Sequence, residues 1–272
     1  MTAPAVRERE EGVVSKGATP YLSHSRVSRY LHCAEQYRLY YVEHLRPKYP
    51  AASLVFGQIL HQALAQLFRT KADPVNVFQR AWNALRGGDL TFGKRESWEQ
   101  LAGCGEKLLA TFVEDELSRI GDVLAVEKGF SLTITSLPLP FVGVIDLLAE
   151  IDGRKTVLDF KTAGSRYEEH TIILSDQLSA YALAEPDTDE VALCVLLKTA
   201  TPRIEWHRST RAAPQLLEYL EKVRIVGNAI TAGHFYKRPG WWCGGCDYLP
   251  VCLGDQQKVR ETLLEVPPAG AP

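Results

Sequence analysis

The 272-residue sequence has no excess of positive charge: 31 lysines and arginines stand against 33 aspartates and glutamates, a formal net charge of −2. A globally basic surface is therefore excluded, and any binding of nucleic acid would need a local basic groove, a metal site or a partner. No apolar run approaches the roughly 18 residues of a membrane-spanning helix. Internal repeats and low-complexity blocks are also missing. The 46% hydrophobic and 24% charged residues are typical of a globular protein with a core.

The first twenty residues are rich in charge and lack the apolar segment of a secretory signal. We therefore expect residues 1–20 to form a flexible tail and the protein to reside in the cytoplasm. Thiols stay reduced in that compartment, so the six cysteines indicate metal ligands sooner than disulfides.

Hydrophobic periodicity predicts an α/β fold, a mixed central β-sheet flanked by helices. Helices are expected first, over residues 25–45 (two short ones), 54–68, 74–85 and 96–119, the last ended by Gly121. Strands are then expected at 123–135, 139–151 and 155–161, a helix at 171–184, strands at 191–198 and 203–208, and a helix at 212–232.

Acidic side chains interrupt two of the expected strands. Asp146 lies within the apolar stretch FVGVIDLL, and Asp159 and Lys161 stand two apart on the next strand, so both point to one face. Burying these charges is costly unless they pair or bind a metal ion, and close carboxylates repel each other. A cation that prefers oxygen ligands, Mg²⁺ or Mn²⁺, would remove that repulsion. An ion pair between Lys161 and either aspartate explains the same residues as well.

Two further pairs of residues are separated by about one helical turn. Gly57 and His61 lie four apart in FGQILHQALAQLF, where the glycine would leave room beside the imidazole. Gln177 and Tyr181 lie four apart in DQLSAYALA and could face the strand that carries Lys161. Each pair by itself is more often plain structure than part of a site.

These residues form four motifs in one order along the chain: G-x-x-x-H, G-x-I-D (Gly143 to Asp146), D-x-K and Q-x-x-x-Y. Each motif is weak alone, but the ordered set resembles the RecB-like branch of the PD-(D/E)XK nuclease superfamily. The resemblance covers residues 25–255. It implies a phosphodiester hydrolase that cleaves DNA, with a restriction-endonuclease-like core whose N- and C-terminal helical segments are joined at a metal cluster.

The resemblance also implies a role for each matching residue. Three side chains and one backbone carbonyl would bind Mg²⁺ or Mn²⁺: His61, Asp146, Asp159 and the carbonyl of Phe160. Lys161 would position the attacking water and stabilise the charged transition state. Gln177 and Tyr181 would contact the DNA backbone or brace the site. Glu127 matches a position where the family often has an acidic residue, although a glutamate on an edge strand is usually just solvated.

Three cysteines near the C-terminus, Cys243, Cys246 and Cys252, have the spacing C-x2-C-x5-C, and Cys33 is the obvious fourth. The remaining two, Cys104 and Cys194, fit better as core residues. Free buried thiols and a four-cysteine zinc site are the alternatives, but structural zinc sites usually have two C-x2-C pairs. The arrangement is similar to iron–sulfur members of this nuclease branch, which implies a [4Fe-4S] cluster. Those members are the AddB-type recombination nucleases and the CRISPR-associated nucleases that process new spacers.

Basic residues near the cysteines are candidates for holding DNA, among them Arg29, Arg38, Lys237 and Arg238, the last two preceding the Trp241-Trp242 pair. We expect one nuclease domain over residues 21–258 and a C-terminal tail over 259–272. The expected function is an exonuclease on single-stranded or frayed DNA ends in repair or recombination, with a helicase as a possible partner. One alternative is a CRISPR spacer-acquisition nuclease beside an integrase, and another is a non-catalytic, DNA-end-binding scaffold.

Overall fold

The computed structural model describes residues 21–94, 96–199 and 201–267. They group into two compact units, the first with residues 51–130 and 144–216 and the second with residues 21–50, 131–143 and 217–267. Within these ranges, no helix is long and apolar enough to cross a membrane. The expected N-terminal tail, residues 1–20, and the last five residues of the expected C-terminal tail lie outside them.

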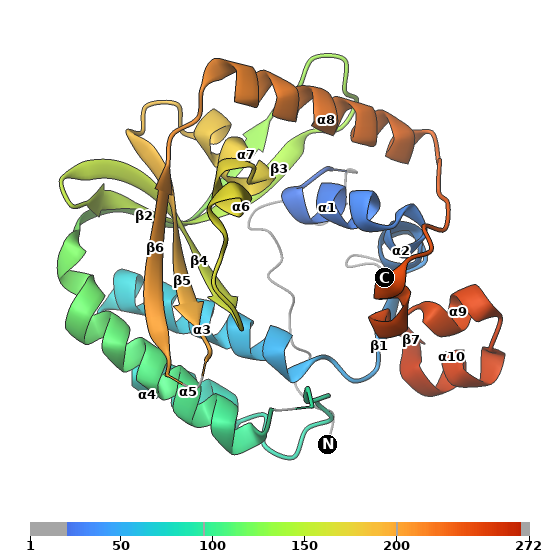
Figure 1. Ribbon diagram of the computed structural model, residues 1–272, viewed down its shortest axis with the longest axis horizontal. Coiled ribbons are helices and arrows are strands. Elements are labelled where there is room, and N and C mark those ends of the chain that lie inside the picture. The colour runs from blue at the N-terminus through green and yellow to red at the C-terminus, as the bar shows by residue number, and fades with distance from the viewer. Residues whose placement is uncertain (1–20, 95, 200, 268–272) are drawn as a thin grey trace. The chain divides into compact units, whose positions relative to one another are not determined.

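A mixed five-stranded sheet forms the centre of the first unit (Figure 1). Its strands lie in the order β2 (Ile120–Leu132), β3 (Phe141–Ile151), β4 (Arg154–Ala163), β5 (Glu190–Leu197) and β6 (Arg203–Ser209). β4 pairs antiparallel with β3 and parallel with β5, and β6 pairs antiparallel with β5. The α/β prediction with a mixed central sheet is confirmed.

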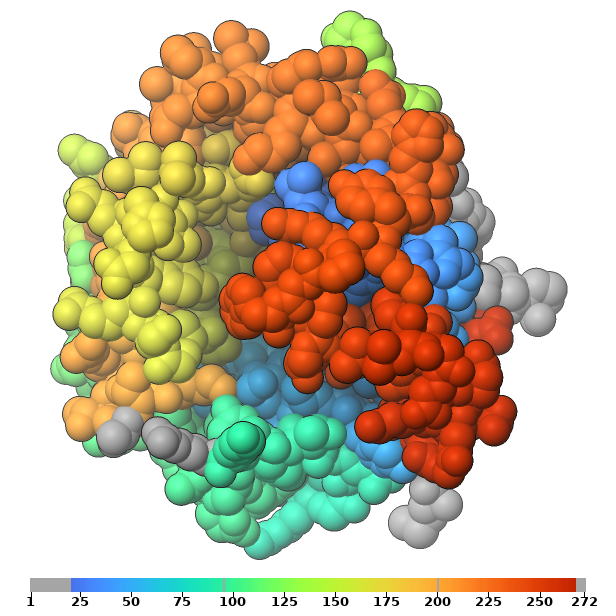
Figure 2. Space-filling model, turned by 45° about the vertical axis from the view of Figure 1, so that its right-hand side comes forward, coloured from blue at the N-terminus to red at the C-terminus, as the bar shows by residue number. Residues whose placement is uncertain are grey.

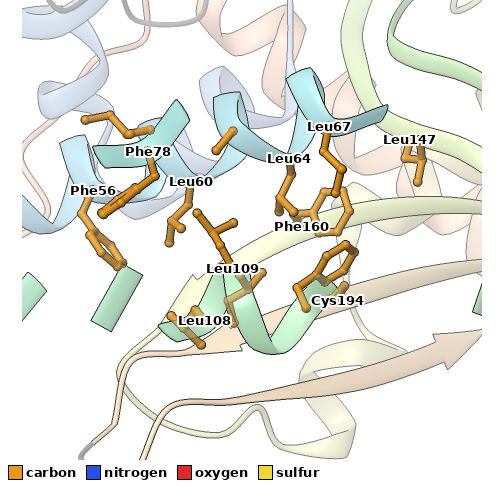
Figure 3. Packing of buried hydrophobic residues seen from close by; sticks show 14 of the residues in the cluster. Phe56, Leu60, Leu64, Leu67, Phe78, Leu108, Leu109, Leu147, Phe160 and Cys194 are labelled. Atoms are coloured by element: carbon orange, nitrogen blue, oxygen red, sulfur yellow. The ribbon is translucent and has the colours of Figure 1, made fainter. Parts of the chain in front are cut away.

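Three helices cover one face of this sheet: α3 (Ala52–Thr70), α4 (Pro74–Asn83) and α5 (Trp98–Thr111). Figure 3 shows their buried side chains meeting Phe160 of β4 and Cys194 of β5. α5 approaches α4 closely at Gly105, where a Cβ atom would lie 2.2 Å from the ring of Phe78. Residues such as Phe78, Trp82 and Leu108 are almost completely buried, and each stabilises the fold by about 1.5–3 kcal/mol relative to an exposed position.

The opposite face of the sheet is covered by two short helices, α6 (Glu169–Ile173) and α7 (Asp176–Ala184). The expected single helix over residues 171–184 is therefore divided. The division lies at Ser175, whose hydroxyl accepts a hydrogen bond from the backbone N–H of Leu178 and so caps α7. Arg211 holds the same turn, because its guanidinium donates to the carbonyl of Ile172 at 2.8 Å and to that of Ser175 at 3.4 Å.

The expected helix over residues 96–119 also differs in the structure. Ser97 caps α5 through the N–H of Gln100, so the helix begins two residues later. After α5 the chain widens into a π-helical turn and a short 3-10 turn, and β2 then begins at Ile120. Gly121 therefore lies in a strand and does not end a helix. Just before β2, the carbonyl of Arg119 accepts a hydrogen bond from the N–H of Asp152 in the β3–β4 turn. This bond joins the start of β2 to the sheet.

The second unit contains α1 (His24–His32), α2 (Ala34–Tyr37), most of α8 (Ala213–Thr231), α9 (Leu249–Leu253) and α10 (Gln256–Thr262). A two-stranded sheet joins its sequence ends, since β1 (Leu45–Pro47) pairs antiparallel with β7 (Leu263–Glu265). Residues 259–265, expected to lie in a tail, thus form the end of α10 and β7.

Candidate active site and cysteine group

The candidate active site lies where β3 and β4 stop pairing. Their last backbone pair joins Leu147 to Leu158. Beyond it, the carboxylate of Asp146 accepts a hydrogen bond from the N–H of Phe160 at 3.0 Å. A side-chain oxygen thus replaces the backbone carbonyl that a continued ladder would supply. In a strand the N–H and C=O of one residue point to the same edge, so the Phe160 carbonyl points toward Asp146 as well.

His61, on α3, brings its imidazole to the same carboxylate. Its Nδ1 atom lies 3.1 Å from Oδ2 of Asp146, and the two side chains are only 16% and 9% exposed. The contact lacks hydrogen-bond geometry, and within the described part of the chain the buried Nδ1 atom has no hydrogen-bond partner. Buried polar groups nearly always have a partner. An unpartnered imidazole nitrogen beside a carboxylate oxygen fits the ligand set of a divalent metal ion.

Asp159 and Lys161 point to the face of β4 that α7 covers, whereas Phe160 between them packs in the core beneath α3. The ammonium of Lys161 lies 2.7 Å from Oδ2 of Asp159. Gln177 links the two, because its side chain accepts from Lys161 at 2.7 Å and donates to Oδ1 of Asp159 at 2.9 Å. The Tyr181 hydroxyl lies 2.8 Å from the same Oδ1 and accepts from Gln177 at 2.7 Å. The structure thus brings together the four residues that the D-x-K and Q-x-x-x-Y spacings suggested.

Burial and charge set the protonation of this group. Burial alone would lower the pKa of Lys161, but the carboxylates of Asp159 and Asp146 raise the pKa above its ordinary value. Burial, followed by the charges of the same two aspartates, raises the pKa of Tyr181 well above its ordinary value. Lys161 is therefore a cation and Tyr181 a neutral hydroxyl at neutral pH. Neither can take a proton from water there.

Gly57 has a different neighbour from the one expected. A Cβ atom at this position would lie 2.9 Å from the hydroxyl oxygen of Thr162 on β4. The glycine lets α3 approach β4, and this close packing brings His61, one turn later, to Asp146. The interpretation that Gly57 makes room beside the imidazole is replaced by this helix–strand contact.

Glu127, on β2, is held by a cation. Its carboxylate lies 2.7 Å from the guanidinium of Arg69, at the end of α3. The backbone φ of Glu127 is 49°, a left-handed conformation that is uncommon for a residue other than glycine. The structure thus gives Glu127 an ion-pair partner, and a role in catalysis stays a prediction.

Arg211 is a residue that the sequence patterns did not single out. Besides the carbonyls of Ile172 and Ser175, its guanidinium donates to the hydroxyl of Ser179 on α7 at 3.2 Å. Burial lowers the pKa of Arg211. The guanidinium therefore fastens the helix that carries Gln177 and Tyr181. No local motif reveals such a residue, because its partners lie more than thirty positions away.

Cys33 and the three C-terminal cysteines lie in the second unit, where the chain segment after α8 returns to α1 and α2. Cys33 separates α1 from α2, Cys243 lies within a 3-10 turn (Trp241–Gly245), Cys246 ends that turn, and Cys252 lies in α9. Burial raises the pKa values of Cys246 and Cys252, and the nearby Cys33 raises both further. Gln36 adds a weak hydrogen bond to the Cys246 sulfur at 3.7 Å.

Residues 234–238, which follow α8, bond to residues of α1 and α2 (Figure 2, orange-red on blue). The N–H of Glu35 donates to the carbonyl of Tyr236 at 3.0 Å, and the Tyr30 hydroxyl donates to the carbonyl of His234 at 2.6 Å. Arg238 donates to the carbonyl of Leu31 at 2.7 Å. The two ends of the sequence are thereby joined around Cys33 by ordinary contacts.

Neither the candidate active site nor the cysteine group forms a complete metal site by itself. Over the described ranges, no three His, Cys, Asp or Glu side chains have the arrangement of one. Cys194 is completely buried in the core of the first unit, and Cys104 is half-buried against that core. The metal and cluster roles of the predicted residues therefore stay predictions.

Residues 21–253 match the family model of the PD-(D/E)XK nuclease superfamily. The crystal structure of a "Putative exonuclease" from Eubacterium rectale superposes with a TM-score of 0.54 at 12% identity, over 87% of this chain and 88% of that one. The structure of SSO0001, at 13% identity over 85% of this chain and 93% of that one, has a TM-score of only 0.38.

No curated protein matches the sequence. The similarity to the Eubacterium rectale structure supports the fold alone, because the identity is low. The family model covers most of the chain and includes every residue of the candidate active site. The chain belongs to the PD-(D/E)XK nuclease superfamily and is a phosphodiester hydrolase.

Proposed function

We propose that the protein is a DNA nuclease of the RecB-like branch that requires Mg²⁺ or Mn²⁺, held by His61, Asp146, Asp159 and the Phe160 carbonyl. The contact between His61 and Asp146 carries the proposal. Nδ1 of His61 and Oδ2 of Asp146 lie 3.1 Å apart with no hydrogen bond between them, beside a second carboxylate and a lysine. Without a cation, this arrangement leaves a buried nitrogen unsatisfied and places two carboxylates against one ammonium.

A bound divalent cation would lower the pKa of a water molecule and offset the charge that develops on the phosphate. The protein's own groups have separate tasks. Lys161, held as a cation, stabilises negative charge on the phosphate and positions the attacking water. Gln177 fixes the direction of the Lys161 ammonium and of the Asp159 carboxylate together. Tyr181 holds Oδ1 of Asp159, so that Oδ2 stays toward Lys161.

The test is cleavage of an end-labelled oligonucleotide in Mn²⁺, Mg²⁺ or EDTA. We expect cleavage in either metal and none in EDTA. Lys161→Met should lower the rate by about 10²-fold or more, because the ammonium acts mainly in the transition state. Lys155→Met, the same change on the same strand, is the matched control. Wild-type protein that binds DNA and never cuts it in either metal would instead support the non-catalytic scaffold.

Cutting of single-stranded or frayed ends, as in DNA repair or recombination, is the finer part of the proposal. A linear single strand and a covalently closed circular single strand of one sequence separate the possibilities. An exonuclease degrades the first and leaves the second intact, whereas an endonuclease cuts both. CRISPR spacer processing is a second setting for the same chemistry, and no contact among the described residues favours it.

We further propose that Cys33, Cys243, Cys246 and Cys252 bind a [4Fe-4S] cluster. Two observations support this proposal: residues 234–238 bond to the helices on either side of Cys33, and Cys33 is among the groups that raise the pKa values of Cys246 and Cys252. Four thiolates complete such a cluster, and zinc would use the same ligands. Iron, sulfide and zinc analysis of protein purified without oxygen decides between them. One equivalent of zinc without iron would refute the cluster.

A further inference from the structure

The second unit has an open hollow on one face of α1. Six residues line it: His24, Ser25, Ser28, Arg29, His32 and Gln36. Five of them belong to α1, at positions that a helix places on one side. Every lining side chain can donate a hydrogen bond, and none is acidic or purely apolar. Such a surface suits an anion with several oxygen atoms.

Arg29 is the fixed cation of this hollow. Its guanidinium stacks on the ring of Tyr40, 3.5 Å from the ring centre, and lies 5.3 Å from that of Tyr41. Within the described ranges Arg29 forms no ion pair, although burial raises the pKa of Asp247 and the charge of Arg29 offsets part of that rise. Its stacking on Tyr40 leaves the guanidinium edge available for hydrogen bonds. The other candidate cations of the second unit are already engaged. Arg38 pairs with Glu35 and Glu43, Lys237 donates to the Cys252 carbonyl, and Arg238 donates to the Leu31 carbonyl.

The tryptophan pair divides into one structural and one exposed residue. Trp242 packs inward, because its ring lies 5.7 Å from that of His32 and its indole N–H donates to the carbonyl of Arg238. Trp241 is 90% exposed and contacts Trp242 edge-on at 6.0 Å between ring centres. The contacts therefore run from the hollow through His32 and Trp242 to an exposed indole. An exposed tryptophan beside a donor-rich hollow is the pairing that single-stranded nucleic acid uses.

We propose that this surface binds single-stranded DNA, with a backbone phosphate in the α1 hollow and a base stacked on Trp241. The proposal rests on the proposed nuclease function in one respect, that DNA is the ligand. None of the residues of the strand-binding surface belongs to the candidate active site. It defines a strand-binding site in the second unit, which would hold the strand whether or not a cut is made.

The experiment measures binding of a fluorescein-labelled oligothymidine in EDTA, where no cleavage is expected, over a range of salt concentrations. Arg29→Ala should weaken binding and reduce the slope of log K against log salt by about 0.7, the value for one phosphate contact on a single strand. Arg224→Ala is the matched control. It removes the same charge from α8 in the same unit, where Arg224 pairs with Glu221 outside the hollow.

Trp241→Ala should weaken binding by roughly 5- to 100-fold and leave the salt slope unchanged, since it removes stacking and no charge. Trp241→Tyr should restore most of the affinity. A duplex of equal length should bind more weakly and be insensitive to Trp241→Ala, because its bases are already stacked. The proposal is overturned if Arg29→Ala and Arg224→Ala have the same effect, or if Trp241→Ala leaves binding unchanged.

This experiment separates the site from the proposed function. Wild-type protein that cuts DNA in Mn²⁺ while both variants bind normally would refute the strand-binding site alone. Protein that binds through Arg29 and Trp241 but never cuts would refute the nuclease proposal and leave the site standing.

Discussion

The Asp146→Asn substitution removes one negative charge from the candidate active site and leaves the shape of the side chain almost unchanged. Asp146 and Asp159 both raise the pKa values of Lys161 and Tyr181, so the site has two carboxylates against one ammonium. If Asp146 is a metal ligand, the substitution should have opposite effects with and without metal. If it is a structural carboxylate, the two conditions should give the same loss.

Without metal, two effects oppose each other in the variant. The hydrogen bond from the Phe160 N–H passes from a charged to a neutral acceptor, at a cost of about 1 kcal/mol. Removing the unbalanced carboxylate relieves repulsion worth on the order of 1–3 kcal/mol. In EDTA the free energy of unfolding of the variant should therefore equal that of wild type or exceed it by up to about 2 kcal/mol.

With Mn²⁺ at 100 times its dissociation constant, a native-state ligand stabilises wild type by about 2.7 kcal/mol. For a protein of this size, that raises the melting temperature by about 5–10 °C. The variant should show much less of this rise. Scanning calorimetry or dye-based melting at pH 8, with and without Mn²⁺, measures all four values. Asp152→Asn is the matched control. Asp152 lies in the β3–β4 turn of the same unit, and its exposed carboxylate pairs with Arg119.

A single result would defeat the reasoning. If Asp146→Asn lowers the melting temperature by the same amount in EDTA and in Mn²⁺, while Asp152→Asn has no effect, Asp146 acts as a structural partner of His61 and Phe160. The metal site would then lie elsewhere.

Three further outcomes follow from the structure. Cys33→Ser should abolish the visible absorption of an iron–sulfur cluster as fully as Cys246→Ser, while Cys104→Ser keeps it; a colour that survives Cys33→Ser places the fourth ligand elsewhere. Burial raises the pKa of the Cys194 thiol well above its ordinary value; iodoacetamide at pH 8.5 should therefore label Cys194 only after denaturation, as peptide mass spectrometry can show. Arg211→Lys should lower the cleavage rate by loosening α7, and guanidinium should partly rescue Arg211→Ala; normal cleavage by Arg211→Lys would show that this helix needs no clamp.

The central strands could be predicted from the sequence because they are short apolar runs, and the long helix α3 because its apolar residues repeat with a helical period. β3 to β6 and α3 lie within a few residues of their expected bounds. The division of α6 from α7 was not predicted; besides the cap at Ser175, Arg211 from beyond β6 holds the turn between them. The three-residue strands β1 and β7 are too short to have a period, and they pair across more than two hundred residues.

The candidate site shows the same limit at the scale of single side chains. The spacing of Asp159, Lys161 and Gln177 predicted that they share one side of β4, and their hydrogen bonds agree. The sequence could not tell which of the adjacent tryptophans is exposed. Trp242 is fixed by His32 and by the carbonyl of Arg238, and both contacts come from the folded chain. Local pattern thus predicts faces, and long-range packing decides which residues remain for a ligand.

Asp146 shows why the site lies at this position of the sheet. Alternation along a regular strand would place Ile145 and Leu147 on one face. In the structure Ile145 packs with Leu148 in the core beneath α7, whereas Leu147 packs in the core beneath α3. The alternation is therefore interrupted at Asp146, which turns toward His61 and bonds the N–H of Phe160. Irregular strand positions are a usual way to direct a side chain into a site. A strictly regular β3 would continue the ladder with β4, and the Phe160 carbonyl would then be consumed by strand pairing.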